Sequence, residues 1–253
     1  MATNFAANIA ESELAARRTR LSFEHRFFLT VAVLFPVITI IGFAPSYYFK
    51  TFTHTPPLPS LLVHAHGLIM SLWIVLFAVQ AYLVSSKRIR LHMTLGIFGF
   101  FVAVAVVVIG LMTGFAAAAR GSGFPGYTPI EFLLVPVIGI VKFIILFGAA
   151  IYYRKNAANH KRLMLLTVLG FLEPSIGRLP FPFILDLGAI WFEGVPDILA
   201  LTFLAADTYR NRKLNKAFAA GVAVMLLGGV VRVMIARTES WTQLATWMLS
   251  WAL

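Results

Sequence analysis

Two histidines interrupt a stretch that is otherwise apolar enough to cross a bilayer, LLVHAHGLIMSLWIVLFAVQAYLV. At 3.6 residues per turn, His66, Trp73 and Gln80 share one helix face, and this face must contact protein because lipid cannot solvate polar groups. An imidazole close to carboxylates suits zinc, iron or manganese. His66 is therefore a candidate metal ligand, and His64, which points away from it on a regular helix, joins it only if the helix start is distorted. The alternative is that His66 is hydrogen-bonded to Asp197 or to a backbone carbonyl.

Three charged residues lie near the middle of predicted membrane spans, namely Lys142, Glu173 and Asp197. A charge at this depth costs at least about 2.5–3.5 kcal/mol on insertion scales, so it usually has a partner. Lys142 and Glu173 lie at similar depth on consecutive spans, and we expect them to pair, either as a purely structural ion pair or, with Asp197, as acid–base catalytic groups. Pro174 should kink its helix, and such breaks at membrane depth often line cavities.

Two arginines, Arg178 and Arg232, lie toward the outer ends of their spans. They are placed to neutralise the membrane-depth acids. Together with His66, Trp73 and the acids, they predict a polar pocket in the outer half of the membrane, where Trp73, Arg178 and Arg232 would contact a cofactor.

A second histidine pair, His92 and His160, begins two parallel spans, each beside a basic loop. One interpretation is that both side chains contact lipid phosphates at the interface. The other is that they bind a haem between the third and fifth spans, because neutral imidazole is a common iron ligand.

The composition is that of a polytopic membrane protein. Of 253 residues 60% are hydrophobic and 12% charged, and the mean hydropathy is +0.85, whereas soluble domains are about 45–50% apolar and about 25% charged. The net charge of +11 resides in short runs between apolar segments, which indicates membrane topology signals and contacts with anionic lipid rather than nucleic-acid binding. The absence of cysteine excludes disulfides, thiolate ligands and cysteine nucleophiles.

Apolar segments predict an all-α fold of seven transmembrane helices in one domain, 26–237, between an interfacial segment 1–25 and an interfacial tail 238–253. Residues 181–188 are expected to form a turn with re-entrant character. The predicted spans cover residues 27–43, 61–84, 92–115, 131–153, 163–180, 189–209 and 217–235.

Lysine and arginine alternate between the two sides of the predicted bundle. Basic clusters precede the first span and follow the second, fourth and sixth spans, whereas the opposite loops carry only Lys50 and Arg120 before the tail. By the positive-inside rule, the N-terminus is inside and the C-terminus outside. We expect the inner (plasma) membrane of a bacterium as the location.

Several motifs resemble those of a widespread group of bacterial integral membrane proteins known only as uncharacterised seven-helix proteins. The motifs are GFAPSYYF, HAHG followed by Trp73 and Gln80, LHMTLG, NHKRLMLLT, and DILAL. The resemblance covers about residues 42–210, and Met93 stands where the group has a basic residue. It implies the seven-helix fold and a shared set of polar positions, but no established activity. These positions are His64, His66, His92, His160, Arg178, Asp197 and Asp207.

These patterns leave three functions open. The first is a metal- or haem-binding oxidoreductase that acts on a lipid-soluble substrate or electron carrier. The second is a metal-free proton-coupled transporter or acid–base enzyme that uses Lys142, Glu173 and Asp197. The third is a structural subunit of a membrane complex whose charges are simply paired. The bilayer is the expected partner in each case, and the sequence determines neither the substrate nor the oligomeric state.

Overall fold

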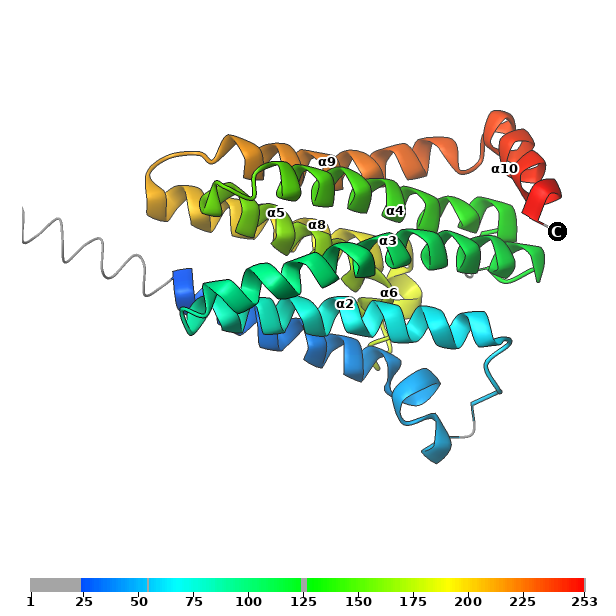
Figure 1. Cartoon of the computed structure of the whole chain (residues 1–253). Helices are drawn as coiled ribbons and strands as arrows, with labels where there is room; N and C mark the ends of the chain where they lie inside the picture. The colour runs from blue at the N-terminus through cyan, green and yellow to red at the C-terminus, as the bar shows by residue number, and fades with distance from the viewer. Residues whose placement is uncertain (1–23, 54, 124–126, 253) are drawn as a thin grey trace, which may run out of the picture.

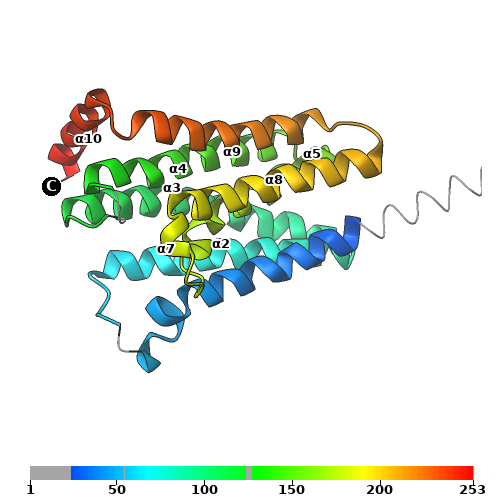
Figure 2. The same ribbon diagram turned by 180° about the vertical axis from the view of Figure 1, so that it is seen from behind.

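The computed structural model describes residues 24–53, 55–123 and 127–252, and this part of the chain is a bundle of helices without strands (Figure 1). The predicted N-terminal segment lies almost entirely outside the described residues. The chain as described starts at one end of the bundle and finishes at the other (Figures 1 and 2).

The first helix spans Glu24–Tyr48 and ends in a π-helical turn, Ala44–Tyr48. The long helices that follow are α2 (Leu61–Ser85), α3 (Ile89–Ala119), α4 (Pro129–Tyr152), α8 (Ala189–Asn211) and α9 (Lys216–Ile235). The shorter elements are η2 (Lys50–Phe52), α5 (Ala157–Leu169), η3 (Gly170–Leu172), α6 (Glu173–Ile176), α7 (Ile184–Leu187) and α10 (Glu239–Ala252).

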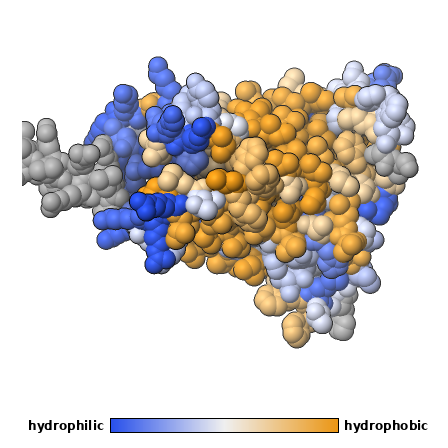
Figure 3. All heavy atoms as spheres, viewed as in Figure 1, coloured by the Kyte–Doolittle hydropathy of each residue, from blue (hydrophilic) through white to orange (hydrophobic). Residues whose placement is uncertain are grey.

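Five described helices are long and apolar enough to cross a membrane: the first helix, α2, α3, α4 and α9. They coincide with the first four and the last of the predicted spans. Large apolar side chains such as Phe101, Ile97 and Val233 are exposed on them. On the face seen in Figure 3, hydrophobic residues form a broad zone between more hydrophilic ends. This is the surface of an integral membrane protein, whose lipid-facing side chains are apolar.

The fifth and sixth predicted spans differ from the other five. The fifth is divided into α5, η3 and α6, so no continuous helix there has the length of a span. Pro174 lies in the first turn of α6 and has no backbone N–H to donate to the preceding turn, which explains why the α-helix gives way to a 3₁₀ turn at Gly170. The sixth is a continuous helix, α8, but Glu193, Asp197 and Asp207 make it less apolar.

Local capping explains where several helices begin. Thr128 and Glu131 form a capping box at the start of α4, in which each side chain accepts a hydrogen bond from the other's backbone N–H. The side chains of Asn156 and Asn215 accept backbone N–H groups in the first turns of α5 and α9. The two asparagine caps end the short basic turns before α5 and α9 and allow the helices on either side to run antiparallel.

The broken segment packs in the centre of the bundle. Leu166, Leu169 and Leu172, which follow one another from α5 into η3, are completely buried. The first helix approaches α6 so closely that a Cβ added to Gly42 would lie 2.3 Å from the carbonyl oxygen of Ser175. Only glycine permits this contact. The break therefore lies inside protein rather than against lipid.

The predicted interfacial tail forms α10, which turns across the end of the bundle (Figure 1). Trp241 is buried, and its indole N–H donates to the carbonyl of Ile130 at 2.9 Å. Trp247 and Trp251 are exposed, with ring centres 6.2 Å apart. The tail is thus anchored on the start of α4 by one tryptophan and presents the other two to its surroundings.

Candidate functional site

A network of buried ion pairs joins four helices at the break. The Lys142 ammonium on α4 donates to Oε1 of Glu173 on α6 at 2.6 Å, so the predicted pairing is present. The other oxygen of Glu173 accepts from Arg232 on α9 at 3.2 Å, and Arg232 also binds Glu193 on α8 at 2.6 Å. One carboxylate therefore holds two cations, and one guanidinium holds two carboxylates.

The side chains of this network are almost completely removed from the surface. Lys142 and Glu173 are 5% exposed and Arg232 is 2% exposed. The backbone makes room for them: a Cβ on Gly228 of α9 would lie 2.5 Å from Cδ of Lys142. Buried charges are tolerated when they are paired and hydrogen-bonded, and here each fully buried charge has an ionic partner.

Asp197 lies one helical turn beyond Glu193 and is half-buried against α9, where its Oδ2 would be 3.5 Å from a Cβ on Gly229. Among the described side chains it has no ion-pair partner. Three carboxylates therefore accompany two cations. Lys142 and Arg232 bind Glu173 and Glu193, so Asp197 is the carboxylate of this cluster without a direct ionic contact among the described residues.

A small cavity lies beside Lys142 at the break, lined also by Thr167, Gly170 and Met225. Its volume of about 10 Å³ is at the lower limit for one water molecule. The buried ammonium thus adjoins a space that a single water can fill. Of the charged network, only Lys142 lines this space.

The outer-half pocket predicted from the sequence comes together only in part. The structure groups Glu173 and Arg232, with Asp197 nearby. Arg178 instead donates to the carbonyl of Pro174 at 2.9 Å and lies over the Phe43 ring at 4.8 Å, without an ion-pair partner among the described residues. The prediction that Arg178 neutralises an acid was therefore wrong, because the turn after α6 directs its side chain toward the first helix.

The His66 side chain is near the guanidinium of Arg178, and its Nδ1 is buried without a hydrogen-bond partner. His64 is exposed and lies against Tyr47, with ring centres 6.2 Å apart. The described residues contain no group of three or more histidine or acidic side chains placed to hold a metal ion. Because like charges repel, the positive charge of Arg178 disfavours the binding of a metal cation at His66.

Trp73 belongs to an aromatic cluster in the core rather than to a polar pocket. It is 2% exposed and packs edge-on against Phe143 and Phe147, with ring centres 5.1 and 5.6 Å apart. Its indole N–H is buried and has no partner among the described residues. Gln80 lies seven residues after Trp73 on α2, and its side-chain amide donates to the carbonyl of His92 at 3.2 Å. This hydrogen bond ties α2 to the start of α3.

The second histidine pair is brought together by the fold. The rings of His92 and His160 have centres 6.4 Å apart and are nearly perpendicular. Nδ1 of His160 is 2.8 Å from the carbonyl oxygen of Ala150. Since a carbonyl only accepts, this Nδ1 carries a proton, and in a neutral ring the lone pair is then on Nε2. Nδ1 of His92 is buried without a partner.

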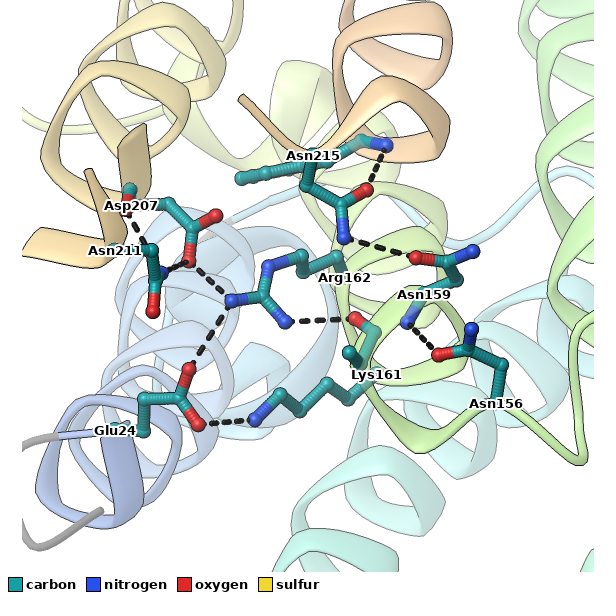
Figure 4. Close-up of polar contacts among 10 residues, drawn as sticks. Glu24, Asn156, Asn159, Lys161, Arg162, Asp207, Asn211 and Asn215 are labelled. Carbon is teal, nitrogen blue, oxygen red and sulfur yellow. Dashed lines mark hydrogen bonds and ion pairs between the residues drawn. The ribbon is translucent and has the colours of Figure 1, made fainter. Parts of the chain in front are cut away.

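A second polar cluster lies at the end of the bundle where the described chain begins. Of its residues the sequence singled out only Asp207, as a position shared with the resembling group, and the cluster itself was missed. Arg162 on α5 lies between Glu24 of the first helix and Asp207 of α8 (Figure 4). Lys161 also pairs with Glu24. An acid at the very start of an apolar span was the available signal. Lys161 and Arg162, the partners of Glu24, are 137 and 138 residues away from it in the chain, so sequence spacing does not reveal these ion pairs.

No protein-family model, curated protein or solved structure matches this chain. The resemblance to uncharacterised seven-helix membrane proteins therefore stays a prediction, and the functional argument depends on the residues themselves.

Proposed function

We propose that this chain crosses the inner membrane of a bacterium seven times, with its N-terminus inside and its C-terminus outside. Two observations support the proposal beyond the five apolar helices. The turns α2–α3, α4–α5 and α8–α9, each of which carries two adjacent basic residues, lie at the same end of the bundle (Figure 1). The two ends of the described chain lie at opposite ends (Figures 1 and 2), as an odd number of crossings requires. The broken segment α5–α6 and the polar helix α8 are the two additional crossings.

Within this bundle, the function that the geometry supports best is proton-coupled transport through the buried charge network. The observation that carries it is the charge count: three carboxylates and two cations at a helix break, of which Asp197 has no ionic partner among the described residues. Discontinuous helices and unbalanced intramembrane acids are the features that transporters use to bind and release protons.

The residues have distinct roles in this proposal. Asp197 binds and releases the proton. Glu173 is the carboxylate that both Lys142 and Arg232 bind. When Asp197 loses its proton, its carboxylate attracts Lys142 and competes with Glu173 for it. The Lys142–Glu173 contact, and with it the packing of α6 against α4, then depends on the protonation of Asp197.

Proton flux into proteoliposomes tests the proposal. An imposed membrane potential should drive proton uptake that a trapped pH-sensitive dye reports, and Asp197→Asn should reduce it at least tenfold. Glu239→Gln, an exposed acid on α10, is the matched control and should leave the flux unchanged. Wild-type flux no greater than that of protein-free liposomes, or full flux in Asp197→Asn, would refute the assignment.

A second candidate function, redox chemistry at a bound haem or metal, is favoured by the His92–His160 pair. The two ring centres are 6.4 Å apart, so His92 and His160 are the residues that would hold such a group. The unpartnered Nδ1 of His92 and the Nε2 lone pair of His160 fit the role of ligands.

The surroundings favour haem over a bare cation. Both histidines adjoin basic turns, which carry Lys87, Arg88 and Lys155 among others. Positive charge repels a free metal ion, whereas it attracts the propionates of a haem. When bound, a haem would supply one-electron chemistry. The two histidines would hold its iron, and the basic turns would orient it.

The absorption spectrum of the purified protein tests this second candidate. A Soret band that is present in wild type and lost in both His92→Ala and His160→Ala would support it. A colourless, metal-free protein purified from haem-supplemented cells would exclude it and leave the proton-coupled function, or a structural subunit if the proton flux is also absent.

A further inference from the structure

A cavity opens at the end of the bundle that carries the second polar cluster. It lies between the first helix, α5, α8 and α9. Its walls combine the charged cluster of Figure 4 with four phenylalanine rings, those of Phe27, Phe28, Phe203 and Phe218. From Arg162 to Glu173 the chain advances by 11 residues, about 16 Å of helix, so this cavity is separate from the buried charge network.

Two buried polar atoms at this cavity lack partners. Arg162 is 5% exposed; its terminal nitrogens donate to Glu24, Asp207 and the carbonyl of Ala158, but its Nε–H has no partner among the described residues. Oδ1 of Asp207 accepts from Arg162 and Asn211, whereas its Oδ2 is buried and also lacks a partner. A buried donor and a buried acceptor, from two residues that line this cavity, are thus left unsatisfied, which is unfavourable in a folded protein.

The cavity specifies the chemistry of the group that can satisfy them. Its volume is about 40 Å³, room for about three water molecules at about 10–15 Å³ each, so only a small polar group enters. The charged side chains that line it are Arg162, Arg210, Glu24 and Asp207, and Lys161 binds Glu24 from outside the lining. An anionic oxygen could not donate a hydrogen bond to the Asp207 carboxylate, so a neutral group is favoured. A hydroxyl is the smallest group that both accepts from Arg162 Nε–H and donates to Asp207 Oδ2.

The remainder of the ligand must be apolar. Phe27 packs edge-on against Phe28 and Phe203, with ring centres 5.4 and 5.0 Å apart, and all three rings are partly exposed. These three phenylalanine rings offer an apolar surface that suits a flat ring or an alkyl chain arriving from the bilayer.

We propose that this cavity binds the hydroxyl head of an uncharged amphiphile dissolved in the membrane, a lipid-soluble phenol or a long-chain alcohol. The hydroxyl lies between Arg162 Nε and Asp207 Oδ2, and the apolar body lies against the phenylalanine rings. Binding satisfies both buried atoms. It also links the first helix, α5 and α8 through the cluster that already joins them. The site is independent of the proton-coupled function proposed above.

Binding of radiolabelled 4-octylphenol to the protein in nanodiscs tests the proposal, with empty nanodiscs as the baseline. We expect saturable binding of one molecule per chain. Ala206 lines the cavity on α8, whereas its neighbour Ala205 does not, and both are exposed. Ala206→Phe should fill the cavity and weaken binding at least tenfold, and the matched variant Ala205→Phe should bind like wild type. Equal binding by the two variants would overturn the proposal.

Competition experiments separate the two ligand types and test the role of the hydroxyl. Displacement by 1-octanol as effective as by unlabelled 4-octylphenol would assign the site to alcohols in general, whereas weaker displacement would assign it to phenols. Octylbenzene lacks the hydroxyl and should not compete; equal competition would refute recognition of the head group. A photoreactive octylphenol provides a readout that needs no variant. It should label peptides that contain residues 24–28 or 203–207, and labelling confined to other helices would refute the site.

Discussion

The Lys142–Glu173 ion pair makes a quantitative prediction about stability. At an effective dielectric constant of about 20, unit charges 2.6 Å apart attract by about 6 kcal/mol, most of which offsets the desolvation of the two groups. Removing one partner of such a pair leaves a buried charge uncompensated and costs about 3–5 kcal/mol. The ion pair itself therefore contributes little net stability, but removing only one of its two charges is costly.

Arg232 also binds Glu173, so the variants Lys142→Met and Glu173→Gln should lose different amounts of stability. In Lys142→Met, Glu173 keeps Arg232 at 3.2 Å, so we expect the lower end of the range, about 3 kcal/mol. In Glu173→Gln, Lys142 loses its ion-pair partner while Arg232 keeps Glu193 at 2.6 Å, so we expect the upper end, about 5 kcal/mol. The double variant removes both charges and should cost less than either single variant, about 0–2 kcal/mol.

Thermal unfolding in detergent, followed by tryptophan fluorescence, measures these differences. For a chain of this size, 1 kcal/mol shifts the Tm by about 2–4 °C, so Lys142→Met should lower it by about 6–12 °C and Glu173→Gln by about 10–20 °C. The double variant should melt above both. Lys213→Met combined with Glu239→Gln, two exposed charges, is the control pair and should show additive, small effects. Additive losses for Lys142 and Glu173 would refute their pairing.

Three further predictions concern topology, packing and the histidines. A C-terminal alkaline phosphatase fusion should be active and a C-terminal GFP fusion dark, because the basic turns otherwise face the wrong side; the opposite pattern would reverse the orientation. Gly42→Ala should destabilise the protein by about 1–3 kcal/mol through the clash with Ser175, whereas Gly148→Ala, which faces open space, should be neutral or slightly stabilising; equal melting temperatures would contradict this close approach. If the protein binds a haem or metal, His66→Ala should leave its amount unchanged, because Arg178 lies near His66; stoichiometric loss would return the metal site to His66.

The sequence was sufficient to predict the helices and their membrane character. Apolar runs of about 20 residues recur with basic turns between them, and both signals are local, so the first four spans and the seventh appear at the expected places. The break near Pro174 is equally local, since proline lacks the donor that the preceding turn requires. The Lys142–Glu173 pairing followed from depth alone, because consecutive antiparallel helices bring residues of equal depth together.

The remaining contacts depend on how each helix is rotated about its axis and on which helices are neighbours, and no local signal specifies either. Both Arg178 and Arg232 were expected to neutralise acids, but only Arg232 does so, in its contact with Glu193. Arg178 does not, because the turn after α6 carries its side chain toward Phe43. Arg162 meets Glu24 across 138 residues because α5 packs against the start of the first helix. A membrane span buries only part of its surface against protein, and interhelical packing selects that part among several apolar faces of nearly equal hydropathy.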